Sequence, residues 1–472
     1  MTLPERLERF LGGRFGLVVL YAFFLGAYLF ASGPRLKRHS HYNHFVYLAE
    51  GWLDGRLSLK SSPPNENDWA KVEELTLADG RQVRGKFSSR GAADRFYFTT
   101  GGSETITPSE IRSRISVRYV SFPPFPAVPM VPFVAIWGLA FNDVLFTVVW
   151  AAFNPVLLFL LLRFLVRKGY SRRSVGEDLQ LTLLLGVGSV YYFSAVLGQV
   201  WFTAQVMAVT LVILYARASI EAAHPWWAGL LLGLGFATRT PLGFMFPFFL
   251  LEAVRMAGGW RELWRGLRTT RWLPPGLFPR LLRCAIPALV VLVVLFLHNH
   301  ARFDRFAVFG HEYLNIAWKE RVERWGLLNY HFLSRNLACA LVLLPKILAH
   351  YPFVQYSRHG LSIFVTSPNL LWLFGTRERS PLGPALWVTI IAAAIPSLLY
   401  QNSGYQQFGY RFLSDYLVYL VILLAVGGQR FGWLWKILLV LSIGINLFGA
   451  ITFDRYPQFS YEDPCIFPHG CN

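Results

Sequence analysis

Long apolar runs recur along most of the chain. They lie at about 15–32, 143–165, 179–198, 202–220, 226–239, 241–256, 284–299, 361–375, 382–400, 414–428 and 433–452. A helix needs roughly 20 mainly apolar residues to cross the hydrocarbon core of a bilayer. The pattern therefore predicts an all-α polytopic membrane protein with about 11 transmembrane helices.

One further apolar run, 122–138, is left out of this count. It contains five prolines, at positions 123, 124, 126, 129 and 132. Proline removes a backbone donor and disrupts a helix, so this density is unlike that of an ordinary span. We expect the segment to lie in the membrane interface.

Between the first two runs lies a long polar stretch, 33–122, whose centre alternates apolar and polar residues. Alternation flanks a turn at Asp79-Gly80, and a second alternating pair of segments turns at Gly101-Gly102. Both are signals for β-hairpins. We expect a small β-barrel-like insert over 70–115. This divides the chain into 1–69 (first span and start of the loop), 70–115 (insert), 116–456 (transmembrane region) and 457–472 (tail).

Composition and charge fit a membrane protein. The chain is 54% hydrophobic and only 15% charged, with a net charge of +18. Arginines gather at the ends of the apolar runs, where they orient helices and meet anionic headgroups, so the basic balance indicates a lipid bilayer and not nucleic acid. No soluble basic domain is evident.

The distribution of cations also predicts an orientation. Arg14 precedes the first run, and the second run ends at Arg163, Arg167 and Lys168. The positive-inside rule then places the N-terminus in the cytoplasm and the 33–122 loop outside, with Asn472 outside as well. Cys465 and Cys471 would share an oxidising compartment, where a disulfide between them is plausible.

Under this topology, unusual polar side chains meet on the outer face. The first loop contributes His39, His41, Asn43, His44, Asp54 and Arg118; later segments contribute Arg239, His311, Glu312, Tyr313 and Arg411. An ionisable residue at the membrane must be offset by a partner or a ligand. Arg239, in Ala237-Thr-Arg-Thr-Pro241, suits a phosphate through bidentate hydrogen bonds. Its alternative role is an interfacial anchor.

Four segments carry a resemblance to a known family. They are Asn43-His-Phe-Val-Tyr-Leu-Ala-Glu-Gly-Trp-Leu-Asp-Gly-Arg-Leu57, Tyr119-Val-Ser-Phe-Pro-Pro124, Gly235-Phe-Ala-Thr-Arg-Thr-Pro241 and Gly409-Tyr-Arg-Phe-Leu-Ser-Asp-Tyr416. They resemble the membrane glycosyltransferases of the GT-C fold, above all the bacterial relatives of dolichyl-phosphate-mannose protein mannosyltransferases and of lipid A aminoarabinose transferases. The resemblance implies transfer of a sugar from a polyprenyl-phosphate donor to a glycan, lipid or protein acceptor outside the bacterial inner membrane.

The resemblance also implies roles for particular residues. The family's acidic first-loop residue is replaced here by His41, so the candidate bases are His41, His44 and Asp54. A base is needed because the acceptor hydroxyl loses a proton as it attacks. Asp54 could equally be a helix-terminus residue. The candidates for the donor phosphate are Arg239, Arg411 and Arg118, and those for substrate binding are Asn43, Tyr47, Trp52, Tyr119, His311 and Tyr313.

Two questions stay open at the level of sequence. No metal- or nucleotide-binding motif is found, which fits a lipid-phosphate donor; we expect no cofactor, with a divalent metal left open. The alternative function is a transporter or flippase-like protein for a lipid-linked sugar. A transporter favours ionisable pairs near mid-membrane and two similar halves, whereas the polar residues here gather at one surface.

Overall fold

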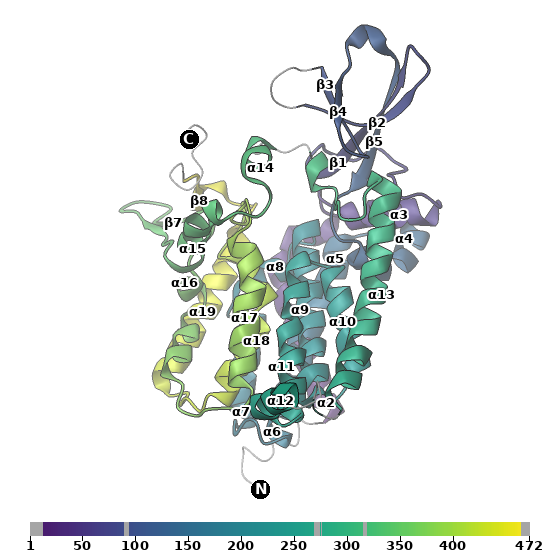
Figure 1. Ribbon diagram of the computed structural model, residues 1–472. Helices are drawn as coiled ribbons and strands as arrows, with labels where there is room; N and C mark the ends of the chain where they lie inside the picture. The colour runs from purple at the N-terminus through teal and green to yellow at the C-terminus, as the bar shows by residue number, and fades with distance from the viewer. Residues whose placement is uncertain (1–12, 89–93, 269–273, 275, 315–318, 464–472) are drawn as a thin grey trace.

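The structure is a computed structural model that describes residues 13–88, 94–268, 274, 276–314 and 319–463. Cys465, Cys471 and Asn472 lie outside the described residues. The predicted disulfide and the predicted side of the C-terminus therefore concern residues that the structure does not describe. The chain is mostly helical, with a sheet projecting from one end of a helical bundle (Figure 1).

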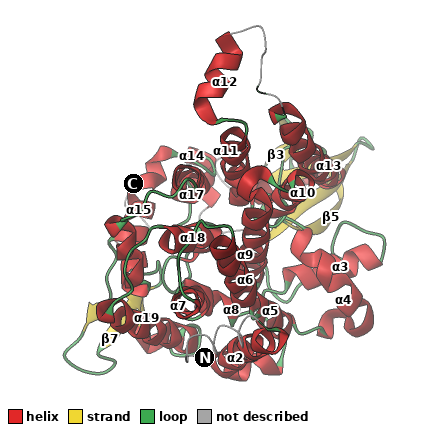
Figure 2. Ribbon diagram, turned by 90° about the horizontal axis from the view of Figure 1, so that it is seen from below, coloured by secondary structure: helices red, strands yellow, loops and turns green. Residues whose placement is uncertain are grey.

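The bundle and its flanking segments contain helices of very different lengths. The helices are α2 (Arg14–Ser32), α3 (His44–Leu53), α4 (Val131–Trp137), α5 (Asp143–Ala151), α6 (Phe153–Arg167), α7 (Val175–Gly186), α8 (Val190–Ala195), α9 (Val200–Ser219), α10 (Pro225–Phe236), α11 (Phe246–Met256), α12 (Gly259–Arg268), α13 (Leu277–Phe303), α14 (Lys319–Trp325), α15 (Leu333–Leu341), α16 (Ile363–Thr366), α17 (Gly383–Leu398), α18 (Leu417–Val426) and α19 (Trp433–Thr452). Short 3-10 helices join several of them, among them η3 (Phe125–Met130), η6 (Thr240–Met245), η9 (Pro368–Gly375) and η10 (Arg411–Asp415). Figure 2 shows the bundle along its axis.

Within the described residues, five helical segments are long and apolar enough to cross a membrane. They are Arg14–Lys37, Asp143–Arg167, Val200–Ala222, Leu277–Phe303 and Trp433–Thr452, and a bent pair made of Thr240–Met256 and Gly259–Arg265 would raise the number to six. The count of about 11 spans is not confirmed. Several apolar runs are broken: α7 ends at Gly186 before α8 begins at Val190, and the 361–375 run consists of α16 and η9.

The proline-rich run also forms short pieces. It folds into η3, α4 and a further 3-10 turn, which together cover Phe125–Ala140 and fall short of the length of a span. Pro129 and Pro132 lie at the junction of η3 and α4, where their missing N–H groups and fixed φ favour a tight turn over a continuous helix.

The projecting sheet has five antiparallel strands. β1 (Trp69–Leu77), β2 (Gln82–Phe87), β3 (Arg95–Phe98), β4 (Ser103–Thr105) and β5 (Ile111–Val120) lie in the order β4-β3-β2-β1-β5. Both predicted hairpins are confirmed, β1 with β2 and β3 with β4. The prediction of a barrel is wrong, because β4 and β5 are the two edges of an open sheet. A strand as short as β4 leaves too little backbone to close a barrel.

Side chains fix this sheet to the end of α13. Arg84 on β2 donates from Nη1 to both carboxylate oxygens of Asp304, at 3.1 and 3.0 Å, and Thr99 donates to the same carboxylate at 2.6 Å. Phe303 packs against Tyr119 and Tyr313 beneath them. The sheet is therefore placed over the end of the bundle by charge pairing and by aromatic packing. A second, small sheet contains β6 (Lys346–Ile347), β7 (Val354–Ser357) and β8 (Ser460–Tyr461).

Candidate functional site

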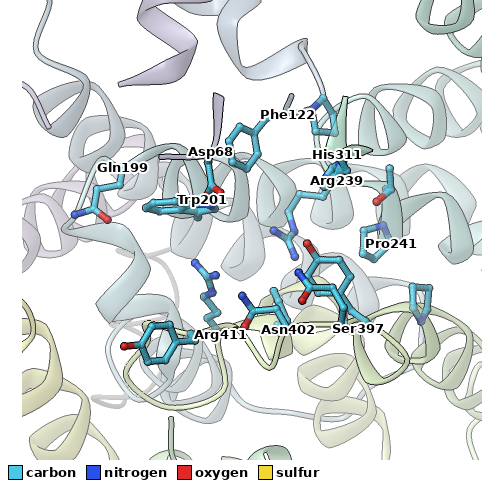
Figure 3. Close-up of a pocket in the computed structure, with 18 of the residues that line it drawn as sticks. Asp68, Phe122, Gln199, Trp201, Arg239, Pro241, His311, Ser397, Asn402 and Arg411 are labelled. Atoms are coloured by element: carbon cyan, nitrogen blue, oxygen red, sulfur yellow. Dashed lines mark hydrogen bonds between the residues drawn. The ribbon is translucent and has the colours of Figure 1, made fainter. Parts of the chain in front are cut away.

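A cavity of about 590 Å³ opens at the end of the bundle that carries the sheet. Its walls come from the loop before β1, the start of α9, η6, the segment after α13, the loop after α17, η10 and the end of α19. The lining residues that carry charged or hydrogen-bonding side chains are Tyr42, Asn67, Asp68, Gln199, Trp201, Thr238, Arg239, Thr240, His311, Ser397, Tyr400, Gln401, Asn402, Tyr405, Gln406, Arg411 and Asp454. Apolar side chains, including Phe122, Phe244, Phe309 and Phe412, line the rest. Figure 3 shows the guanidinium groups of Arg239 and Arg411 pointing into this space.

Arg411 is the most unusual of these residues. Its side chain is only 6% exposed, and among the described residues no carboxylate lies within ion-pair distance of it. Its Nε has no hydrogen-bond partner, and the rings of Trp201, Phe202 and Phe412 surround the guanidinium at 5.3–5.9 Å. The carboxylates of Asp68 and Asp415 act on this cation electrostatically without a direct ion pair, and a buried cation that no carboxylate contacts is costly. This position therefore favours an anionic ligand.

The backbone around Arg411 is held from both sides. Its N–H donates to the side-chain oxygen of Gln407 at 2.9 Å, and its carbonyl accepts from Gln205 on α9 at 3.2 Å. Gln407 donates in turn to the carbonyls of His359 and Ser403. Buried amides thus fix the base of the side chain before any ligand arrives.

Arg239 differs from Arg411 because it has a carboxylate partner. Its Nε and Nη2 donate to the two carboxylate oxygens of Asp415 at 2.6 and 2.8 Å. Asp415 is fully buried, and its partner is 14% exposed toward the cavity. A planar guanidinium held in this way has a fixed orientation. The guanidinium of Arg239 therefore has a fixed orientation in the cavity wall, and the carboxylate of Asp415 balances part of its charge.

Asp68 places a carboxyl group in the same cavity. Trp201 donates to it from Nε1 at 3.1 Å. Burial raises the pKa of Asp68 to about 6, although the hydrogen bond from Trp201 and the positive charge of Arg411 both act to lower that pKa. A carboxylate with a pKa in this range is largely ionised at neutral pH and can still accept a proton. The side chains of Gln199 and Asn402 add amide groups to the same wall.

Of the residues named from the sequence, Arg239, Arg411 and His311 line the cavity. Burial lowers the pKa of His311, so its imidazole is neutral at neutral pH. The structure brings these three together from η10, from the N-cap of η6 and from the segment after α13. These three are the candidate site residues from the sequence that lie in the cavity wall.

The candidate bases of the first loop lie elsewhere. His41 is exposed and is not among the lining residues; its carbonyl accepts from Asn65. His44 is fully buried and stacks on Trp69 with 3.8 Å between ring centroids, and burial lowers its pKa to about 4. Asp54 ends α3 in ion pairs with Lys60 and Arg56, of which the former is the larger cause of its lowered pKa. These contacts hold the loop itself together.

The remaining candidates are also away from the cavity walls. Asn43 is the buried N-cap of α3, Tyr47 donates to the carbonyl of Ser62, and Trp52 lies near His298. Tyr119 and Tyr313 belong to the aromatic contact between the sheet and α13, and Arg118 pairs with Glu66 at 2.7 Å. Each of these side chains other than Asn43, whose buried Oδ1 has no hydrogen-bond partner among the described residues, thus has a packing or pairing partner in the structure.

Sequence reasoning missed Asp68 and Trp201. Asp68 follows the polar run Asn65-Glu-Asn67 directly before the first strand, so it was visible in the sequence as an acidic residue of the long 33–122 loop. Trp201 stands at the start of an apolar run and gave no separate signal. Among the described residues, no group of three or more His, Cys, Asp or Glu side chains is arranged to hold a metal ion.

Comparisons with known proteins yielded one similar solved structure. No family profile matches the chain, and no curated protein matches it. One similar solved structure is the crystal structure of the Archaeoglobus fulgidus oligosaccharyltransferase in the apo form. It is 13% identical, with a TM-score of 0.39 over 93% of this chain and 55% of that one. The chain thus corresponds to about half the length of that neighbour.

Proposed function

We propose that the chain is a membrane glycosyltransferase that moves a sugar from a polyprenyl-phosphate donor to an acceptor at the cavity. The observation that carries the proposal is the buried Arg411 guanidinium, which faces the cavity without a carboxylate partner among the described residues. A phosphate matches it in charge and in hydrogen-bonding geometry. The sequence resemblance to GT-C glycosyltransferases supports the same assignment.

The cavity offers a role for each group that transfer requires. The acceptor hydroxyl oxygen forms a bond to the anomeric carbon while the bond from that carbon to the phosphate oxygen breaks. Asp68 takes the hydroxyl proton as general base. Arg411, with Arg239 beside it, stabilises the charge that grows on the leaving polyprenyl phosphate. Trp201 offers an aromatic face for the sugar ring, and Gln199 and Asn402 offer hydrogen bonds to its hydroxyls.

The proposal includes an orientation in the bacterial inner membrane. Lys168, in the turn after α6, pairs with Glu221, and Arg217 lies over the ring of Phe164. These cations lie at the end of the bundle opposite the sheet, which we name the basic end. The positive-inside rule favours a cytoplasmic basic end. The cavity then opens outside, where the acceptor is a glycan, a lipid or a protein.

The test uses Arg411 and a control cation. Purified protein in liposomes is titrated with undecaprenyl phosphate, and Arg411→Gln is compared with Arg172→Gln, whose side chain is 86% exposed at the basic end. We expect Arg411→Gln to weaken binding roughly tenfold or more, because a hydrogen-bonded charge is lost, and Arg172→Gln to leave it unchanged. Equal affinity in all three proteins would refute the phosphate site.

A transfer assay then distinguishes the enzyme from a carrier. Radiolabelled polyprenyl-phosphate sugars are presented with envelope fractions as acceptors. Transfer of label to a fraction, lost in Arg411→Gln, is the expected result. Binding of undecaprenyl phosphate with no transfer to any fraction, but with movement of donor across the bilayer, would instead identify a flippase-like carrier.

A further inference from the structure

Helix α12 has two distinct faces. Its sequence is Gly259-Trp-Arg-Glu-Leu-Trp-Arg-Gly-Leu-Arg268. Trp260, Leu263 and Trp264 follow the i, i+3, i+4 spacing of one helical face. The three arginines, at 261, 265 and 268, follow an i, i+4, i+7 spacing on another face. Bulky aromatic groups and a row of cations thus share one short helix.

The backbone turns α12 away from the bundle. The axes on either side of residues 257–258 differ by 76°. Gly258 and Gly259 both have positive φ, at 98° and 76°, which a residue with a Cβ adopts only with strain. Figure 2, which looks along the bundle, shows α12 extending outward from the end of α11. The helix therefore lies nearly perpendicular to the bundle axis, which is the direction of a membrane surface.

The level of α12 along the bundle is set by Arg255 in the last turn of α11. Its Nη2 donates at 2.9 Å to Tyr170, in the turn after α6, so α12 begins at the basic end. Trp226 and Trp227, 51% and 62% exposed at the start of α10, add tryptophans that mark a membrane boundary. The start of α12 thus lies at the basic end of the bundle, where these exposed tryptophans also lie.

The tryptophans of α12 are themselves exposed. Trp260 is 56% exposed and Trp264 is 59% exposed, while Leu263 between them packs against the bundle core. Water is a poor environment for two such indole rings, whereas the interface holds their apolar bodies and their N–H groups together. The arginines on the other face have the charge that complements anionic headgroups.

We propose that α12 is a membrane-surface helix that binds anionic phospholipid, with its tryptophans in the acyl boundary and its arginines at the phosphates. Three arginines and one glutamate give the segment a net charge of +2. Tryptophan and leucine on one face and arginine on the other is the composition of helices that lie in a bilayer interface. The site is separate from the cavity, which is at the opposite end of the bundle.

The first experiment measures depth in the membrane. The full chain carries Cys465→Ser and Cys471→Ser and retains the buried Cys284 and Cys339. A nitroxide is attached at Trp260→Cys or at Arg261→Cys, and the protein is placed in nanodiscs of phosphatidylcholine and phosphatidylglycerol. We expect the nitroxide at 260 to be accessible to oxygen and protected from a water-soluble nickel complex, and the one at 261 to be the reverse. Equal exposure of both positions to nickel would overturn the proposal. Magnetic coupling between labels at 260 on two chains would also overturn it, by assigning the face to a second copy.

The second experiment measures lipid selectivity. Native mass spectrometry counts the phosphatidylglycerol and phosphatidylcholine molecules retained by the wild type, by Arg261→Gln/Arg268→Gln and by the control Arg172→Gln. We expect the wild type to retain phosphatidylglycerol in preference to phosphatidylcholine. In the double variant, the ratio of retained phosphatidylglycerol to phosphatidylcholine should fall by roughly fivefold for each arginine removed. The control should match the wild type. No preference in the wild type, or an equal loss in the control, would overturn the assignment. Because the side chains of Arg261 and Arg268 are exposed, the substitutions leave the bundle core intact.

Discussion

At the scale of the residue, Asp68 is a carboxyl group whose surroundings oppose its ionisation and whose neighbours partly restore it. Burial raises its pKa to about 6, against the effects of Trp201 and Arg411. Removing any one of these influences changes the fraction of carboxylate at a given pH. Its ionisation is therefore set by three identifiable contributions: burial, the hydrogen bond from Trp201 and the charge of Arg411.

Asp68→Asn should reduce transfer by roughly 10²–10⁴-fold, the usual effect of losing a general base. Asparagine keeps the size of the side chain but cannot take the acceptor proton. Binding of undecaprenyl phosphate should persist, since Arg411 and Arg239 are untouched. The measurement is turnover with a radiolabelled donor, with binding measured in parallel.

The matched comparison is His41→Ala. His41 stands where the resembling family has its acidic residue, but it is exposed and outside the cavity lining. If Asp68 is the base, His41→Ala retains most of the activity. A large loss in His41→Ala with full activity in Asp68→Asn would return the role of base to the imidazole.

The pH dependence gives a second check on Asp68. The base acts as carboxylate, so kcat/KM should fall as the pH drops through about 6 and the carboxyl group is protonated. In Trp201→Phe the carboxylate loses the hydrogen bond from the indole Nε1, so the pKa of Asp68 should rise. The profile of that variant should shift to higher pH. An unmoved profile would show that another group controls it.

At the scale of the element, the pair Arg239–Asp415 ties η6 to η10. The two oxygen contacts, at 2.6 and 2.8 Å, join segments 176 residues apart. Because Asp415 is fully buried, the guanidinium of Arg239 is the group that pairs with its carboxylate inside the protein. The pair is thus a structural link as well as part of the cavity wall.

Arg239→Leu should destabilise the protein by about 3–5 kcal/mol, because the buried carboxylate of Asp415 is left without a partner. The double variant Arg239→Leu/Asp415→Leu should recover much of that loss, since no charge remains buried. Denaturant unfolding in detergent micelles measures both. A double variant less stable than Arg239→Leu would show that the two residues do not form a stability-determining pair.

The elements also show which structure was visible from the sequence. The hairpins at Asp79-Gly80 and Gly101-Gly102 were predicted correctly, because alternation and turn glycines are local signals. The breaks at Gly186 and at Pro368 were missed. Hydropathy measures the composition of a run and does not report whether its backbone stays helical, so broken runs were counted as spans.

At the scale of the whole molecule, the cavity depends on long-range placement. Arg239 and Arg411, which line the cavity, could be named from the sequence because an ionisable residue beside an apolar run stands out by itself. The pKa of Asp68 depends on its contacts with Trp201 on α9 and Arg411 on η10. These contacts exist only in the folded chain, so the sequence did not indicate them. Conversely, the first-loop motif was read as a site because of its crowded histidines, although His44 fills a packing position against Trp69.

The spread of the cavity along the chain bears on how the protein is made. Asp68 lies near the start of the chain and is synthesised early, whereas Phe453 and Asp454 directly follow α19 and are synthesised late. All three residues line the same cavity. A nascent chain that has not yet inserted α19 lacks that wall. The cavity is therefore complete only after the residues that follow α19 have been synthesised and folded against the rest of the bundle.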